Sequence, residues 1–405
     1  MEKIAAKSSA YRWVVMSAFM AVVAINQILW ITFAPVTSAA AEFYQVDVLS
    51  IGLLSMSFMI VYILVSIPAS WIIDRFGIKV GVGIGAVLTG VFGFVRGLAG
   101  GNYGLTLFAQ IMIAVGQPFI LNAITSIAAQ WFPPDERVTA SGLGSLSIYL
   151  GIFAGMLVTP LLAAQFGISQ MLLIYGIASL LPVITFFIFF KGRPVSAGDA
   201  GEPEVRSLMF DGLRETLKNK NFILLLAVFF VGLGIFNAVT TWIEDLLKPR
   251  GFSIAQAGFT GGMMIIGGII GAVLLPTLSD KAHKRVPFLL ATVLGATVGL
   301  AGVTYASSYF LLLASAFILG FFLLSAGPIG FQYGAEITHP VPEGTSNGLL
   351  LLMGQISGIL FIFGMEMFKS PETGSMTASL NILLALMVVA LFLSTRLKES
   401  IKQAQ

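Results

Sequence analysis

The stretch SMSFMIVYILVSIPASWIIDRFGIKV at 55–80 decides the fold class. It begins as an apolar run and ends in a charged turn, as a helix does when it crosses a bilayer and stops at its edge. Similar runs fill the 405 residues, of which 57% are hydrophobic and 10% charged, whereas a soluble domain is roughly 25% charged. The mean hydropathy is +0.95. This composition excludes a soluble enzyme, a nucleic-acid-binding protein and a disordered chain.

The length of the chain allows twelve spanning helices, because each needs about 20 apolar residues plus a connection. The apolar runs are long and unbroken, which argues against a barrel of short alternating strands. We therefore predict an all-α integral membrane protein. The predicted spans are 11–41, 48–73, 80–99, 104–131, 138–165, 168–190, 221–247, 255–279, 286–306, 309–333, 344–368 and 374–396.

Basic residues fix the predicted orientation, because Lys and Arg concentrate on the cytoplasmic side of membrane proteins. With the spans above, 18 of the 22 Lys and Arg residues fall on the face that carries both termini. The four on the opposite face are Arg96, Lys248, Arg250 and Lys369. We therefore expect cytoplasmic N- and C-termini and a multi-pass protein of the cell membrane (inner or plasma membrane).

The long polar segment 191–220 divides the chain into two similar halves. We predict an N-terminal six-helix bundle at 1–190, a cytoplasmic linker with a short surface helix at 191–220, and a C-terminal six-helix bundle at 221–405. The halves echo each other: SIPASWIIDRFGIKVG at 66–81 and LLPTLSDKAHKR at 274–285 both end a helix with Pro, then Asp, then a basic turn. Parallel six-helix repeats of this kind leave a central cavity that can open to either side.

The DRFG turn at 74–77 resembles the signature of the loop between helices 2 and 3 in the major facilitator superfamily. Asp74 can cap the following helix and pair with basic groups of a neighbouring helix end. Asp280 and Arg285 form the weaker copy in the second half. We expect Asp74, Arg75, Asp280 and Arg285 to act as a cytoplasmic gate; the alternative is a set of ordinary charged loops at the membrane edge.

Polar residues inside the spans are functional candidates, since they are costly in a bilayer. No Asp, Glu, His, Lys or Arg lies at the middle of a predicted span, which favours facilitated diffusion over proton-driven transport. A carboxylate at the cavity edge, such as Glu244, would reverse that inference. The mid-span polar residues are mostly amides: Asn26 and Gln27 before Trp30, Gln110, Gln117, Asn122, Asn237 before Trp242, Asn347 and Gln355.

A cavity lined by tryptophan and amides, without fixed charge, suits a small cationic or zwitterionic solute. The face of an indole ring attracts cations, including quaternary ammonium groups, and an amide can meet a hydroxyl or amine. Trp30 has Asn26 one turn before it, so the two share a helix face. The alternative for each single amide is a hydrogen bond between helices.

Three stretches carry a narrower resemblance: 55–80, GQPFILNAITSIAAQWFPPDE at 116–136, and GFQYGAEITHPVPEGTSNGLLLLMGQISGI at 330–359. They resemble the feline leukaemia virus subgroup C receptor-related transporters, a group associated with uptake of choline and ethanolamine and with haem export. The resemblance implies the major facilitator fold, with helices 1, 4, 7 and 11 lining the cavity.

The resemblance also implies a choline site built from one residue on each cavity-lining helix. The matching positions are Trp30, Gln117 and Gln355, whereas Asn237 stands where the family has an aromatic residue on helix 7. Asn26, Asn122 and Trp242 complete the set of predicted substrate-binding residues. The missing aromatic leaves choline, a less methylated amine or another polar metabolite open.

We therefore predict an alternating-access transporter of a small polar solute, most simply a choline-like or ethanolamine-like amine, that works by facilitated diffusion as a monomer in the lipid bilayer. No cofactor, metal, catalytic residue or nucleic-acid partner is expected. The alternatives are a proton-coupled symporter or antiporter of an organic anion or drug, a haem exporter, and a receptor or scaffold without transport. A membrane enzyme is disfavoured, because no nucleophile–base pair or metal-ligand cluster is apparent.

Overall fold

The computed structural model describes residues 2–133, 136–190, 216–339, 341 and 343–399. Every regular element within these ranges is a helix. The chain divides into two compact units, Met1–Ala200 and Gly201–Gln405. Each unit is described by itself.

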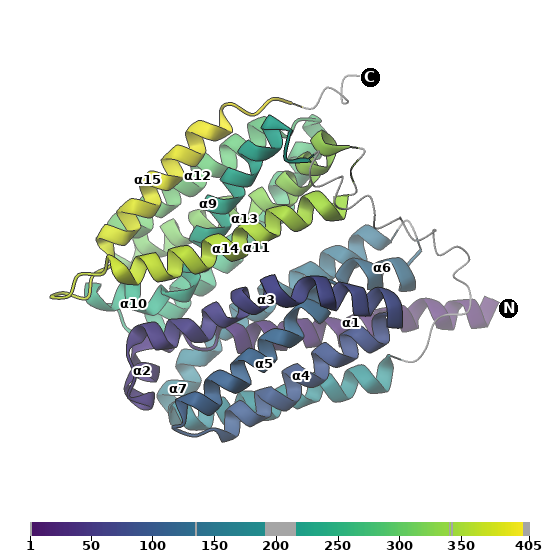
Figure 1. Ribbon diagram of the computed structural model, residues 1–405, viewed down its shortest axis with the longest axis horizontal. Helices are drawn as coiled ribbons and strands as arrows, with labels where there is room; N and C mark the ends of the chain where they lie inside the picture. The colour runs from purple at the N-terminus through teal and green to yellow at the C-terminus, as the bar shows by residue number, and fades with distance from the viewer. Residues whose placement is uncertain (1, 134–135, 191–215, 340, 342, 400–405) are drawn as a thin grey trace. The chain divides into compact units, whose positions relative to one another are not determined.

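In the N-terminal unit, α1 and α4 pack along α7, and α3 and α4 pack against α5. Figure 1 shows the short α2 following the end of α1, and α4 and α5 running along one another. The elements are α1 (Glu2–Ile31), the 3-10 helix η1 (Ala34–Val36), α2 (Thr37–Tyr44), α3 (Val48–Phe76), α4 (Ile78–Leu98), α5 (Tyr103–Leu121), α6 (Ile124–Trp131) and α7 (Arg137–Phe189).

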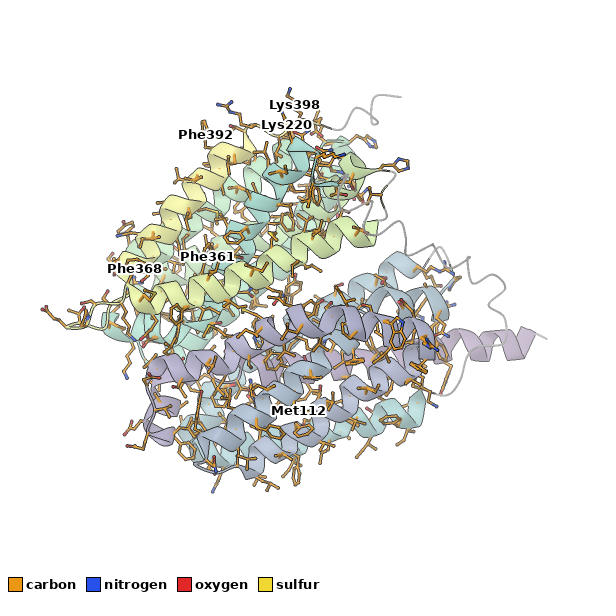
Figure 2. The ribbon with its side chains drawn as sticks, in the orientation of Figure 1. Met112, Lys220, Phe361, Phe368, Phe392 and Lys398 are labelled. Carbon is orange, nitrogen blue, oxygen red and sulfur yellow. The ribbon has the colours of Figure 1, made fainter. Side chains whose placement is uncertain are left out.

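In the C-terminal unit, α13 packs against α11 and α12, and α9 packs against α14 and α15. Lys220, which begins α9, and Lys398, which follows α15, lie at the same end of this unit (Figure 2). The elements are α9 (Lys220–Thr241), α10 (Ile243–Leu247), the 3-10 helix η2 (Lys248–Arg250), α11 (Ile254–Ala282), α12 (Val286–Tyr305), α13 (Tyr309–Thr338), α14 (Glu343–Met367) and α15 (Thr377–Ser394).

The prediction of a twelve-helix membrane fold is confirmed. Among the described residues, 11 helical runs are long and apolar enough to cross a bilayer. One of them, α7, has 53 residues and would extend about 80 Å if it were straight, against a hydrocarbon core of about 30 Å. Gly167 divides α7 with φ 78° and ψ 167°, a conformation that glycine adopts readily. The run therefore supplies two spans, as the sequence predicted.

Short polar side chains begin several of these helices at the membrane edge. Asp47 accepts a hydrogen bond from the Ser50 backbone N–H at 2.7 Å, and Asn102 accepts one from the Leu105 N–H at 2.9 Å. Such caps satisfy backbone donors that the first turn of a helix leaves free. The hydrogen bonds that Asp47 receives from the side chain and backbone of Ser50 lower the pKa of the Asp47 carboxyl.

Small residues let the helices approach closely, which matters because lipid offers no hydrophobic drive for helix association. A Cβ atom at Gly320 of α13 would overlap the carbonyl oxygen of Met264 on α11, and one at Gly267 would overlap that of Phe317. The glycine-rich face of α11 is buried at this contact. Glycine is therefore required here for the close approach of two backbones.

Large apolar side chains cover the outside of the helices. Phe368 and Phe392, marked in Figure 2, are 57% and 59% exposed. In water such a surface would cause aggregation, whereas in a bilayer it contacts lipid acyl chains. The exposed surface therefore agrees with the burial pattern of a membrane protein.

The polar segment predicted as a linker with a surface helix lies largely outside the described residues, at 191–215. The description resumes at Thr216, and Asn219 caps α9 by accepting from the backbone N–H groups of Asn221 and Phe222.

Candidate functional site

Polar residues of both units lie at or near points where a predicted spanning helix is interrupted. The first predicted span is interrupted after Ile31, where α1 ends, and the chain passes through η1 before it continues as α2. Pro35 lies in the interruption and cannot donate a backbone hydrogen bond. Trp30, the predicted cation-binding residue, is the last but one residue of α1. Interrupted helices commonly form the binding sites of transporters, because they expose backbone groups at the middle of the membrane.

Arg96 of α4 holds the end of α1 in place. Its Nη1 donates to the Leu29 carbonyl at 2.8 Å and to Gln110 Oε1 at 2.7 Å, and its Nη2 donates to Thr32 Oγ1 at 3.2 Å. The guanidinium also lies over the Phe33 ring, 5.4 Å from its centroid. Arg96 is fully buried, so it meets the free carbonyl end of a helix as a charge-assisted donor.

The fourth predicted span is interrupted between α5 and α6 at Asn122, four residues after Pro118. Asn122 Oδ1 accepts from the Tyr62 hydroxyl at 2.8 Å. Asn122 Nδ2 donates to the hydroxyls of Ser66 and Ser70 at 3.0 and 2.9 Å. The polar atoms of Asn122 are thus engaged in tying the interruption to α3.

The seventh predicted span is interrupted at Trp242, between α9 and α10. Trp242 is fully buried and its indole N–H donates to the Ile362 carbonyl at 3.0 Å. Just before it, the hydroxyls of Thr240 and Thr241 are buried without a hydrogen-bond partner among the described residues. This end of α9 therefore carries unused polar groups beside a helix break.

Asn237, a predicted site residue of the C-terminal unit, contacts α14 next to the position of a second one, Gln355. Asn237 Nδ2 donates to the Gly354 carbonyl at 3.1 Å, directly before Gln355 on α14. The two helices can come this close because Gly234 has no side chain. A Cβ atom at this position would lie only 2.6 Å from Ser357 Oγ. Asn237 of α9 thus contacts the backbone of α14 at the residue before Gln355.

Two predicted amides have no hydrogen bond to any residue in the described part of the chain. Gln117 is 7% exposed and lies beside Pro118, near the interruption of the fourth span. Gln355 is half-buried in the middle of α14. Asn347, two turns before Gln355, has a buried Oδ1 that also lacks a partner. Polar groups at membrane depth normally find partners, so these amides keep hydrogen-bonding capacity that the described residues do not use.

Four other predicted residues make hydrogen bonds within their own unit: Asn26, Trp30, Asn122 and Trp242. Asn26 is fully buried, and its Nδ2 donates to Thr89 Oγ1 at 3.0 Å while its Oδ1 accepts from Gln27 at 3.3 Å. The Trp30 indole N–H donates to the Ser55 carbonyl at 3.3 Å, and the residue is 6% exposed. Asn26, Asn122 and Trp242 therefore serve the packing of the helices in this structure.

The charged residues predicted as a gate lie at helix ends. Asp74 and Arg75 end α3 and, with Ser126 and Gln130 of α6, line a hollow of about 490 Å³. The Arg75 guanidinium lies over the Trp71 ring, 5.2 Å from its centroid. This end of the N-terminal unit therefore offers an open polar surface.

Arg285 joins three segments of the C-terminal unit. It pairs with Asp280 at the end of α11 and, at 3.2 Å, with Glu336 of α13. The Glu399 carboxylate accepts from the backbone N–H groups of Arg285 and Val286, both at 2.9 Å. Burial opposes the charged form of Arg285, but the hydrogen bond to Asp280 and the charge of Glu336 outweigh it and raise the pKa of Arg285.

A second cluster of charged residues lies around α10, which follows the C-terminal end of α9. Lys369 pairs with Asp245 at 2.5 Å and with Glu366 at 3.5 Å. Glu244 beside them is 1% exposed. In the described part of the chain, His, Asp and Glu form no group that could hold a metal ion.

The comparisons agree with this architecture. A model of the Major Facilitator Superfamily matches residues 19–362. The protein is a multi-pass membrane transporter and not an enzyme, and it belongs to the Major Facilitator Superfamily.

The relatives bear out the narrower resemblance. The chain is 28% identical over 385 residues to Solute carrier family 49 member A3 of Danio rerio, covering 91% of this chain and 81% of the relative. It is 28% identical over 376 residues to the Choline/ethanolamine transporter FLVCR2 of Homo sapiens, covering 88% and 71%. A bacterial homologue of the human lysosomal transporter Spinster shares the fold, with a TM-score of 0.76 at 16% identity over 97% of this chain and 98% of that one.

Proposed function

We propose that this protein transports a small polar amine of the choline or ethanolamine type. The observation that carries the proposal is the state of Gln117 and Gln355, which are amides at membrane depth without a hydrogen-bond partner among the described residues. Trp30 lies at the helix interruption after α1, and Gln117 and Asn237 each lie more than one turn before an interruption, at Asn122 and Trp242. The FLVCR2 relative, named as a choline/ethanolamine transporter, supports the same class of substrate.

The chemistry of these side chains fits an amine that also carries a hydroxyl group. The indole N–H of Trp30 is used by Ser55, so Trp30 would act through its ring face, which attracts an ammonium group. The amides of Gln117 and Gln355 would accept from or donate to the hydroxyl. Asn237 in place of an aromatic residue supplies a hydrogen-bonding group, which favours an amine with N–H donors over a fully methylated one.

The rest of the proposal concerns the transport cycle. Alternating access by a monomer would expose the site first to one side of the cell membrane and then to the other, with Asp74, Arg75, Asp280 and Arg285 acting at the cytoplasmic side. The distribution of Lys and Arg supports cytoplasmic termini. The mid-span amides carry no charge, which supports facilitated diffusion.

The proposal is tested by uptake into proteoliposomes with purified wild-type and variant proteins. Gln117→Ala and Gln355→Ala should each reduce uptake of choline or ethanolamine by roughly tenfold or more, because each loses a ligand hydrogen bond inside the membrane. The control is Gln165→Ala, which removes an exposed amide of α7. Uptake at wild-type rates in both site variants, with all proteins equally folded, would refute the site.

A proton-coupled mechanism is the second candidate, because buried carboxylates of α10 lie beside the interruption between α9 and α10. Glu244 and Asp245 are 1% and 6% exposed. A protonophore distinguishes the two mechanisms. Facilitated diffusion predicts unchanged initial rates of uptake, whereas coupling through these carboxylates predicts loss of accumulation.

A further inference from the structure

The N-terminal unit carries a groove on the outside of α4 and the second half of α7. It has a volume of about 470 Å³. Its wall is apolar apart from one lysine at its end, and consists of Lys79, Val80, Gly83, Ile84, Val87, Leu88 and Phe187.

Gly83 leaves space in the groove beside Phe187. A Cβ atom at Gly83 would lie 3.3 Å from Cζ of Phe187, so a larger side chain would fill the space. Val80, Val87 and Phe187 are 46%, 40% and 46% exposed. These side chains lie within spanning helices, where the solvent of an exposed apolar surface is lipid.

Lys79 gives the groove one charged end. Its side chain is exposed, and it forms no ion pair with any residue in the described ranges. It lies in the first turn of α4, at the end of the unit that carries the DRFG turn. Lysine in such a position extends its ammonium group toward the membrane surface while its methylenes stay on apolar neighbours.

We propose that this groove binds a phospholipid with an anionic headgroup. The phosphate would contact the Lys79 ammonium, and one acyl chain would run across Gly83 against Phe187. From Lys79 to Val87 the helix rises about 12 Å, which fits the upper part of an acyl chain. Beyond Lys79 the groove offers no side chain that could hydrogen-bond a small polar solute. The lysine charge and the apolar wall together therefore favour an anionic amphiphile.

Native mass spectrometry of the delipidated protein tests the proposal, with phosphatidylglycerol and phosphatidylcholine as probes. Phosphatidylglycerol should bind more tightly to the wild type. In Lys79→Gln that binding should weaken about fivefold, the effect of one lysine near an anionic lipid surface. Phosphatidylcholine, whose choline group offsets the charge of its own phosphate, should lose less affinity. The matched control is Lys281→Gln, an exposed lysine at the end of α11, which should leave both affinities unchanged.

Two further variants test the acyl-chain part of the groove. Gly83→Leu fills the groove from within, and Val87→Phe narrows it from the lipid side without touching the buried core. Either should weaken binding of both lipids. The proposal is overturned if Lys79→Gln binds phosphatidylglycerol like the wild type, if Lys281→Gln loses as much, or if Val87→Phe, once folded, binds both lipids normally. It is also overturned if these variants instead change the oligomeric state, which would mean that a second copy covers the groove.

Discussion

Replacement of Arg96 should change the stability of the N-terminal unit, because Arg96 is a fully buried cation whose hydrogen bonds go to neutral groups. Two replacements separate its charge from its geometry. Arg96→Met removes the charge and keeps an unbranched apolar side chain. Arg96→Lys keeps the charge but loses the planar fork that reaches several acceptors at once.

The expected magnitudes follow from the contacts. In Arg96→Met, Gln110 Oε1 loses its donor and is left buried, at a cost of about 1–3 kcal/mol. The Leu29 carbonyl still accepts from Gln110 Nε2 at 3.3 Å, and removal of a buried charge offsets part of the loss. In Arg96→Lys the buried charge stays, while two charge-assisted hydrogen bonds worth about 1.5–3 kcal/mol each disappear. We therefore expect lysine to destabilise the fold more than methionine does.

Thermal unfolding in detergent measures the relative stability of the two variants. Uptake by the folded fraction measures whether loss of the Arg96 contacts impairs the site at Trp30. We expect the unfolding temperature to fall in the order wild type, Arg96→Met, Arg96→Lys. Uptake per folded molecule should drop in both variants, because the end of α1 beside Trp30 loses its anchor. If Arg96→Lys is as stable as the wild type, charge alone matters and the reasoning from geometry fails.

Three further predictions concern the packing and the helix ends. Gly320→Leu should abolish the folded monomer peak in size-exclusion chromatography, whereas Gly348→Leu, where added atoms meet open space, should leave it intact. Asp47→Ala should lower the unfolding temperature at pH 7 through loss of a cap worth about 1 kcal/mol. Because the pKa of Asp47 is lowered in the fold, its stabilisation is present at neutral pH and is lost as the pH falls through that pKa, so wild type and variant should converge in acid. Lys369→Met should destabilise more than the double variant Lys369→Met/Asp245→Leu, because the single change leaves a buried carboxylate without its ion pair.

The sequence predicts the spans well because hydropathy and the placement of Lys and Arg report directly on the membrane. It does not locate the interruptions, since the hydropathy of a whole span does not report where its helix breaks. Pro35 and Pro118 are the signals that could have found two of the three, whereas the break at Trp242 has no such marker. Side-chain partners are beyond the sequence as well: Asn122 and Gln117 are both amides of the fourth span, yet only Asn122 finds hydroxyl groups on α3.

The burial of Arg96 could not be predicted from the sequence either. The sequence places it near the end of a span, where an arginine usually reaches water. The structure buries it completely, because the broken end of α1 offers carbonyl and hydroxyl acceptors that the sequence cannot position. The contact of Asn237 with α14 depends in turn on Gly234, whose missing side chain lets α9 approach α14.

The most direct test of the central claim is the uptake of radiolabelled choline and ethanolamine into proteoliposomes that contain the wild type or Gln355→Ala. Saturable uptake of at least one of these amines by the wild type, lost in the equally stable Gln355→Ala, is the expected result. If neither amine enters faster than in protein-free liposomes, or if Gln355→Ala transports as well as the wild type, the proposed substrate class or its site is wrong.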